Sequence, residues 1–303
     1  MLISIVGPTA IGKTKLAILL AKRYGTEIIS ADSRQFFKEM AIGTAVPNAE
    51  ELAAAKHHFI QHISVTDAYS VGDFERDALE QLDKLFNSHS IVVMVGGSGL
   101  YVDAVTKGLD NFPVVAANIR DELNQKLKDF GITSLQTKLK ELDETYYNKV
   151  DLNNPHRLIR ALEICMGTGK PYSSFLNQPK KPRNFKTFTI GLTADRELIY
   201  DNINHRVDVM LSSGLVEEVK SLARYKHLNA LQTVGYKELF MHFGGIWDYD
   251  QAVCEIKKNT RRFAKRQLTW FRKNENIFWV DSNANWKNQL ELIEEALQKK
   301  YDE

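Results

Sequence analysis

The segment LISIVGPTAIGKT at residues 2–14 decides the fold of this chain. Its first five residues are largely apolar, as in a buried strand, and the pattern Gly-x-x-x-x-Gly-Lys-Thr of a phosphate-binding loop follows at once. Residues 13–24 then repeat apolar side chains at helical spacing until Gly25 stops the helix. A strand, a glycine loop and a helix in this order predict that the chain binds the phosphates of a small ligand.

The loop offers phosphate three kinds of contact. Its glycines let backbone N–H groups turn toward phosphate oxygens, and the start of the helix adds partial positive charge. Lys13 adds a full charge, and Thr14 offers a hydroxyl to Mg²⁺ as the expected metal ligand. The residues expected at the phosphates are Gly7, Pro8, Thr9, Ala10, Ile11, Gly12, Lys13 and Thr14.

The rest of the chain predicts an α/β fold, a P-loop-type parallel sheet flanked by helices, with an all-helical insertion domain. Strand-like segments occur at 27–30, 91–95, 188–192 and 277–280, with helical patterns between them. Long polar helices without strand character, at 120–130 and 134–150, dominate the region after residue 111. We expect a core formed by residues 1–110 and 187–303 and an insertion at 111–186.

Two polar residues follow predicted strands and should face the loop, because ligands of open parallel sheets sit at the carboxyl ends of strands. Asp32 can ligate Mg²⁺ through water or take a proton from a substrate; the alternative is a helix or turn cap. Ser98 can hydrogen-bond phosphate, or it is an ordinary turn residue of the sequence Gly96-Gly97-Ser98-Gly99.

The net charge of the 303-residue chain is only +2, so any anionic partner must be bound by a local patch of basic residues. Residues 257–273 carry eight basic side chains and no acid, and on a helix they would leave a separate apolar face. A second cluster, Arg157 and Arg160, follows a helix start capped by Asn154. Solvated surface helices are the plainer alternative, but two basic segments and one phosphate loop suggest two anionic substrates.

Three further patterns bear on location and on competing functions. Cys165 and Cys254 lie far apart, which fits buried core thiols in a reducing compartment, and the sequence contains no stretch of membrane-spanning length. We therefore expect a cytoplasmic protein. The guanine-reading pattern NKVD at 148–151 does not follow an apolar strand, and the histidines 57, 58 and 62 lack the partners of a metal site.

The ordered motifs of the chain resemble those of the tRNA dimethylallyltransferases. The similarity covers nearly the whole sequence: GPTAIGKT at 7–14, SADSRQ at 30–35, IGTA at 42–45, VGGSGLY at 95–101, HRLIRALEI at 156–164, RVDVMLSSGLVEEV at 206–219, QTVGYKEL at 232–239 and KRQLTWFRK at 265–273. A phosphate loop alone admits many functions, whereas this set with these spacings is specific to one family.

The resemblance implies Mg²⁺-dependent transfer of a dimethylallyl group from dimethylallyl diphosphate to N6 of the adenosine 3′-adjacent to the anticodon, in tRNAs reading codons that begin with U. The loop would hold the leaving diphosphate, and the target base would be extruded into a channel. Asp32 would be the general base, Ser98 would contact both substrates, and Lys13 and Arg206 would bind the diphosphate. The insertion would contact the tRNA anticodon stem-loop, and the protein would act as a monomer.

The family's RNA-contacting segments map onto several stretches of this chain. They are Asp32, Ser33, Arg34, Gln35, Ser98, Arg120, His156, Arg157, Leu158, Ile159, Arg160, Gln232, Thr233, Val234, Gly235, Tyr236, Lys237, Lys265, Arg266, Gln267, Leu268, Thr269, Trp270, Phe271 and Arg272. The chain departs from the usual family pattern at Val46, where a lysine is typical, and at Lys56, where a proline is typical. These changes can alter RNA affinity.

Two other functions compete with this interpretation. A small-molecule kinase would use the same loop, but the predicted strand at 91–95 ends in glycines and serine rather than in an acidic Mg²⁺ ligand. A non-catalytic RNA-binding module would explain the basic segments but leaves the phosphate loop without a purpose.

Overall fold

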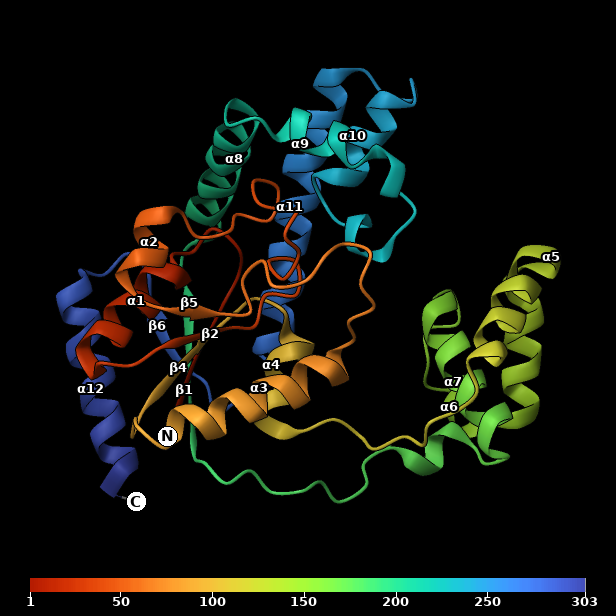
Figure 1. The fold of residues 1–303 in the computed structure, drawn as a ribbon, viewed down its shortest axis with the longest axis horizontal. Coiled ribbons are helices and arrows are strands. Elements are labelled where there is room, and N and C mark those ends of the chain that lie inside the picture. Colours follow the sequence, from red (N-terminus) through yellow and green to blue (C-terminus); the bar gives the residue numbers. More distant parts are fainter. Residues whose placement is uncertain (303) are drawn as a thin grey trace. The chain divides into compact units, whose positions relative to one another are not determined.

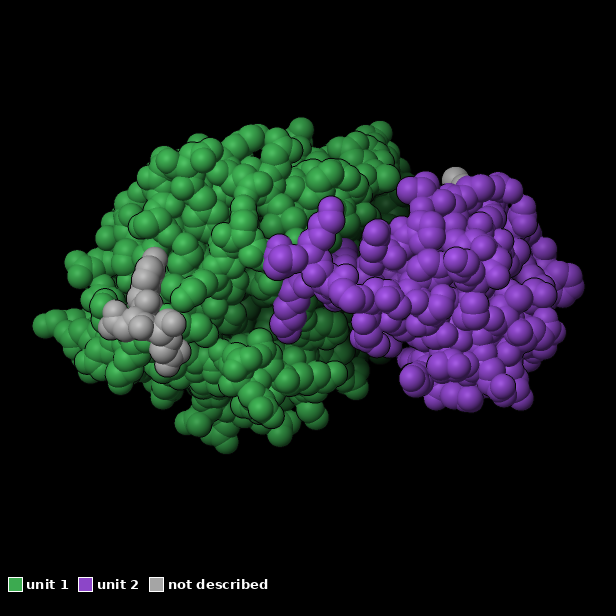
Figure 2. All heavy atoms as spheres, turned by 90° about the horizontal axis from the view of Figure 1, so that it is seen from below, with its two compact units in different colours: residues 1–106, 183–303 green, residues 107–182 purple. Residues whose placement is uncertain are grey.

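The computed structural model describes residues 1–302, which divide into two compact units (Figure 2). The first unit comprises Met1–Thr106 and the chain from Arg183 onward, and the second is Lys107–Pro182. The second unit contains the expected insertion, 111–186, apart from its last four residues. No helix among the described residues is long and apolar enough to cross a membrane.

The first unit is built on a six-stranded parallel sheet of order β3-β2-β4-β1-β5-β6 (Figure 1). The strands are β1 Leu2–Val6, β2 Ile28–Ser30, β3 His57–His58, β4 Val92–Val95, β5 Thr187–Thr193 and β6 Phe278–Asp281. This confirms the predicted α/β class and all the predicted strands. The edge strand β3 was not predicted, since two histidines carry no alternating pattern.

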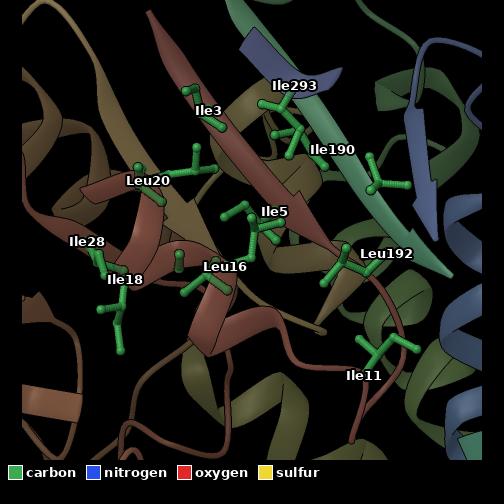
Figure 3. Close-up of a cluster of buried hydrophobic side chains, with 14 of the residues drawn as sticks. Ile3, Ile5, Ile11, Leu16, Ile18, Leu20, Ile28, Ile190, Leu192 and Ile293 are labelled. Carbon is green, nitrogen blue, oxygen red and sulfur yellow. The ribbon is translucent and has the colours of Figure 1, made fainter. Parts of the chain in front are cut away.

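Helices cover both faces of this sheet. The α-helices of the first unit are α1 Lys13–Tyr24, α2 Ala49–Ala54, α3 Val71–Phe86, α4 Gly99–Lys107, α8 Arg196–Ser212, α9 Leu215–Ser221, α10 Tyr236–Phe243, α11 Tyr249–Phe271 and α12 Trp286–Asp302. Alternate residues of each strand point to opposite faces. Ile3 and Ile5 therefore join one core with α1, α8 and α12 (Figure 3), whereas Leu2 and Val6 join another with α3 and α4.

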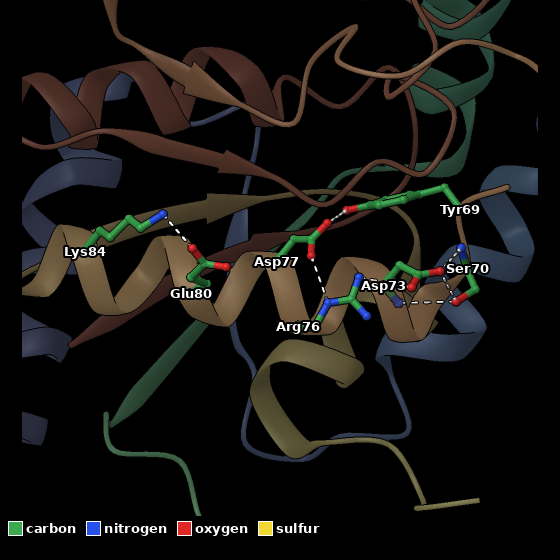
Figure 4. Close-up of polar contacts among 7 residues, drawn as sticks. All are labelled: Tyr69, Ser70, Asp73, Arg76, Asp77, Glu80 and Lys84. Carbon is green, nitrogen blue, oxygen red and sulfur yellow. Dashed lines mark hydrogen bonds and ion pairs between the residues drawn. The ribbon is translucent and has the colours of Figure 1, made fainter. Parts of the chain in front are cut away.

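Polar contacts fix helix α3, which lies on the second face (Figure 4). Ser70 caps the helix, because its side chain accepts from the Asp73 N–H while the Asp73 carboxylate accepts from the Ser70 N–H. The Tyr69 hydroxyl donates to Asp77 at 2.9 Å, and Lys84 pairs with Glu80 one turn away. These contacts set where the helix begins while its apolar side faces the sheet.

Close backbone approaches at glycines bring the strand ends together. Gly7 has φ of 147°, and a Cβ there would lie 2.8 Å from the Leu192 carbonyl oxygen at the end of β5. A Cβ on Gly96 would lie 2.4 Å from the Ala31 carbonyl oxygen, just after β2. Larger residues at either position would force the loops apart.

The second unit is helical, with α5 Ala117–Leu142, α6 Glu144–Tyr147, α7 Pro155–Thr168 and a 3₁₀ turn at Tyr172–Phe175. Gly131, with φ of 70°, interrupts α5 where the sequence predicted the break between two helices. The Asn154 side chain accepts from the Arg157 N–H at 3.2 Å, as expected of a cap. The NKVD segment follows α6 and no strand of the sheet, so it is no guanine site.

The prediction that both cysteines are buried is wrong for Cys254. Cys165 is buried in α7, but Cys254 is exposed on α11. The reason is helical geometry, because Ala252 and Ile256 occupy the inward side of that turn and leave Cys254 facing outward.

We expect Leu16→Ala to lower the free energy of unfolding by about 2 to 5 kcal/mol, because the side chain is fully buried beneath the sheet. The matched control is Leu292→Ala in α12, whose side chain is 50% exposed and whose loss should change stability by about 0.5 kcal/mol or less. Urea titration measures both. Equal effects of the two substitutions would contradict this packing.

Candidate active site

Three neighbouring strands, β2, β4 and β1, end at one edge of the sheet and supply the site. The phosphate loop follows β1, Asp32 follows β2, and the turn containing Ser98 follows β4. The Ser33 N–H donates to the Ser98 hydroxyl oxygen at 3.1 Å, so the last two segments are in direct contact. The structure thus brings together the loop, Asp32 and Ser98, as the sequence predicted.

Lys13 is held inside the loop. Its Nζ donates to the Pro8 carbonyl oxygen at 2.7 Å. Burial lowers the pKa of Lys13 to about 8, nearby Asp32 partly opposes this fall, and Arg206 adds to it. A phosphate bound in the loop would favour the charged ammonium and raise that pKa again.

Arg206 reaches the loop from helix α8. Its Nη1 donates to the Thr9 hydroxyl oxygen at 3.3 Å, and Asn202, one turn earlier, donates to the Ala10 carbonyl oxygen. Burial lowers the pKa of the Arg206 guanidinium, and Asp32 opposes this change. A second partly buried cation therefore acts on Lys13, and the Asp32 carboxylate acts on both.

Two cavities meet at this site. The P-loop cavity, of about 880 Å³, is bordered by residues 9–15 and by the segment 41–49. The second cavity, of about 610 Å³, is bordered by Ser98, by residues 232–235 and by α11. Their common wall is formed by Thr9, Asp32, Thr44, Ala45, Arg206 and Met210. A ligand in the first cavity and a ligand in the second would both reach Asp32.

Aromatic and basic side chains of α11 border the second cavity. Phe263, Arg266 and Trp270 line it, and the Trp270 Nε1 donates to Asp103 on α4 at 2.9 Å. The Arg266 guanidinium lies over the Phe263 ring. Although Phe263 is apolar, it is 39% exposed, because it faces this cavity.

The loop at 41–45 separates the cavities and is fixed by a carboxylate that sequence reasoning missed. Glu218 accepts the backbone N–H groups of residues 41, 42 and 43 at 2.7 to 2.9 Å, and also the hydroxyl of Tyr236 at 2.6 Å. Gln35 donates to the carbonyl oxygens of Thr44 and Ala45. The signal available in the sequence was that Gln35, residues 42–45, Glu218 and Tyr236 lie in four separate family motifs.

Several side chains expected at RNA make internal contacts. The Arg34 guanidinium donates to the carbonyl oxygens of Asn229 and Ala230, at 2.8 and 3.0 Å. In the second unit, Arg120 and Arg160 both pair with the nearly buried Glu163. His156 and Arg157, at the start of α7, are exposed. Of the two departures from the family pattern, Val46 borders the P-loop cavity and Lys56 pairs with Glu27.

Five of the residues carried over as RNA contacts have buried side chains, so a contact between these side chains and RNA stays a prediction. Each lies on the inward side of a segment whose other side is exposed, so a contiguous motif mixes core and surface positions. They are Leu158, Ile159, Tyr236, Gln267 and Phe271.

The histidines 57, 58 and 62 are accounted for by local contacts. His58 contacts the Glu27 carboxylate, and the His57 Nδ1 lies 2.7 Å from the Ala55 carbonyl oxygen. His62 packs against the rings of Phe36 and Tyr69. Within residues 1–302, no group of three or more His, Cys, Asp or Glu side chains could hold a metal ion.

Comparisons with known proteins agree on one family. The family model described as IPP transferase matches residues 35–274. A tRNA dimethylallyltransferase of Christiangramia forsetii is 64% identical over 296 residues, 98% of either chain. The crystal structure of the tRNA isopentenylpyrophosphate transferase from Bacillus halodurans is 36% identical, with a TM-score of 0.74 over 99% of this chain and 96% of that one. A eukaryotic dimethylallyltransferase captured acting on tRNA gives 25% identity and a TM-score of 0.83, over 99% and 79%.

The depressed pKa of Lys13 predicts pH-dependent anion binding. Since the folded-state pKa is about 8, the ammonium loses its proton as pH rises through that value, and the affinity for inorganic pyrophosphate should fall between pH 7 and 9. Calorimetry measures this affinity. The control is Lys13→Arg, whose side chain stays charged between pH 7 and 9, so any change in its affinity reports the titration of pyrophosphate itself. An affinity that changes equally in both proteins would contradict the shift.

Tyr236→Phe should lower the free energy of unfolding by about 1 to 2 kcal/mol, because it removes a hydrogen bond to the Glu218 carboxylate. Since the side chain is buried, RNA affinity should not change. Tyr249→Phe is the control, with a tyrosine that is 41% exposed. Weakened RNA binding without loss of stability would show instead that Tyr236 contacts RNA.

Proposed function

This chain belongs to the IPP transferase family, and we propose that it is a tRNA dimethylallyltransferase. It transfers the dimethylallyl group of dimethylallyl diphosphate to N6 of the adenosine 3′-adjacent to the anticodon, in tRNAs reading codons that begin with U. The names of its relatives support the activity. The single structural observation that supports it best is the pair of cavities with a common wall at Asp32.

The P-loop cavity suits the donor. As the bond between the allylic carbon and the diphosphate oxygen breaks, negative charge grows on the leaving group. Lys13, Arg206 and the N–H groups of the loop lie where they can stabilise that charge. Because both cations are partly buried, their attraction for the diphosphate is screened less than it would be at the surface.

Asp32 is placed to act as the general base. The nitrogen N6 of adenine bonds to the allylic carbon, and the proton it loses passes to the Asp32 carboxylate. The Arg34 N–H donates to one oxygen of this carboxylate at 3.1 Å and so orients it. Ser98, which borders the second cavity, can contact the base or the leaving group.

The site also fits Mg²⁺ as a cofactor. Magnesium is usually held by one or two protein oxygens together with substrate phosphates and waters. The Thr14 hydroxyl and the Asp32 carboxylate both border the P-loop cavity and can provide such oxygens. When bound, the ion would neutralise part of the diphosphate charge.

The second cavity suits an extruded adenine. A stacked base in an anticodon loop cannot reach a recessed carboxylate, so it must leave its stack, and aromatic side chains can hold it. Phe263 and Trp270 border the cavity, and the neighbouring Lys265, Arg266 and Arg272 are exposed and basic. Basic residues of the second unit, Arg120, Arg157 and Arg160, offer further contacts to the RNA backbone.

A single copy of the chain in the cytoplasm is sufficient for this function. Every residue that borders the two cavities belongs to the first unit of one chain. We therefore propose a monomer that modifies tRNA in the compartment where tRNA is used.

Incubation with dimethylallyl diphosphate, Mg²⁺ and unmodified tRNA should give prenylated adenosine, read by mass spectrometry of the nucleosides. Asp32→Ala should reduce turnover by about 100-fold or more, because the base is lost, while pyrophosphate still binds in the absence of Mg²⁺, because Lys13 and Arg206 remain. The exposed Asp67→Ala is the control. An unmodified tRNA would refute the function, and an active Asp32→Ala would refute the base assignment.

A further inference from the structure

Gln267 is a buried residue in the most basic helix of the chain. It lies on α11 directly after Lys265 and Arg266, both exposed, yet it is only 6% exposed itself. A buried amide must find hydrogen-bond partners or destabilise the protein.

The side chain of Gln267 links two loops of the site. Its Oε1 accepts the Thr9 N–H of the phosphate loop at 2.9 Å, and its Nε2 donates to the Gly97 carbonyl oxygen at 2.9 Å. A Cβ on Gly97 would lie 2.2 Å from that Nε2, so the amide fills the space beside the glycine. One group with a donor and an acceptor thus holds the ends of β1 and β4 to α11.

The same helix borders the second cavity on its neighbouring side. Arg266 directly precedes Gln267, and Trp270 follows it by three residues, on an adjacent position of the helix surface. A Cβ on Gly99 would lie 2.3 Å from the Trp270 ring, so the helix and the turn after β4 are packed closely at a second point. A ligand pressing on this part of α11 therefore acts on the segment that holds Thr9 and Gly97.

We propose that Gln267 is a positioning residue that couples RNA binding on α11 to the shape of the diphosphate cradle. This rests on the proposed function, because it takes the second cavity as the RNA side. Pyrophosphate bound in the loop fixes the position of Thr9. Through the Gln267 side-chain amide, it then favours the position of α11 to which RNA binds. By thermodynamic linkage, tRNA then raises the affinity for pyrophosphate by the same factor.

The chain offers a matched control for loss of a buried amide. Gln289 in α12 is fully buried, and its Nε2 donates to the carbonyl oxygens of Asp281 and Ala284. It borders neither cavity. Replacing it with methionine should cost stability without touching the site.

The experiment compares Gln267→Met with Gln289→Met. Calorimetry with inorganic pyrophosphate and Mg²⁺, and tRNA binding with and without pyrophosphate, are measured on each protein. For Gln267→Met we expect pyrophosphate binding about tenfold weaker, tRNA affinity alone within about twofold, and no effect of pyrophosphate on tRNA affinity. Gln289→Met should retain wild-type binding and the wild-type effect of pyrophosphate.

Gln267→Glu provides a second variant, which keeps the acceptor for Thr9 but places a carboxylate oxygen against the Gly97 carbonyl. It should raise the KM for dimethylallyl diphosphate more than the KM for tRNA. Weaker tRNA binding with unchanged pyrophosphate binding would overturn the proposal in favour of direct RNA contact. Equal losses in Gln267→Met and Gln289→Met, or no effect of pyrophosphate on tRNA affinity in the wild type, would overturn it as well.

These binding measurements do not depend on turnover. A chain that failed to prenylate tRNA but bound pyrophosphate through Gln267 would refute the proposed function alone. A chain that prenylated tRNA without any coupling through Gln267 would refute this inference alone.

Discussion

The site is organised around one carboxylate, Asp32, and two partly buried cations, Lys13 and Arg206, whose charges it influences. Two positive charges and one negative charge leave an excess of positive charge where solvent screening is weak. Burial lowers the pKa of Lys13 to about 8; Asp32 partly opposes this shift, and Arg206 adds to it. In the function proposed above, a diphosphate would balance this excess of positive charge, so the phosphate loop, Asp32 and Arg206 would act together.

The parallel sheet makes this arrangement possible. Because β2, β4 and β1 are neighbours and run in the same direction, the segments that follow them meet at one edge. Close backbone contacts at Gly7 and Gly96 bring those segments within reach of each other. Side chains from outside the sheet, Glu218, Arg206 and Gln267, then fix each loop by hydrogen bonds.

The helices and strands could be predicted from the sequence more fully than the contacts between them. The strand at 2–6, the helix at 13–24 and the places of Asp32 and Ser98 followed from local patterns, because hydrophobic periodicity and glycine loops are encoded by neighbouring residues. The roles of Gln267 and Glu218 depend on backbone partners 170 or more residues away, and a polar side chain in a helix looks like a surface residue until its partners are known. Cys254 was misplaced for a related reason, because the sequence does not show which side of α11 packs against the core.

The proposed reaction differs from nucleotide hydrolysis at a phosphate-binding loop in one respect. The loop binds a diphosphate that leaves intact, and the energy of the reaction comes from the donor itself. The most direct test counts products in a reaction without ATP, with dimethylallyl diphosphate, Mg²⁺ and unmodified tRNA. The account predicts one inorganic diphosphate released for each prenylated adenosine, at the same rate. A requirement for ATP, or prenylation without release of diphosphate, would contradict it.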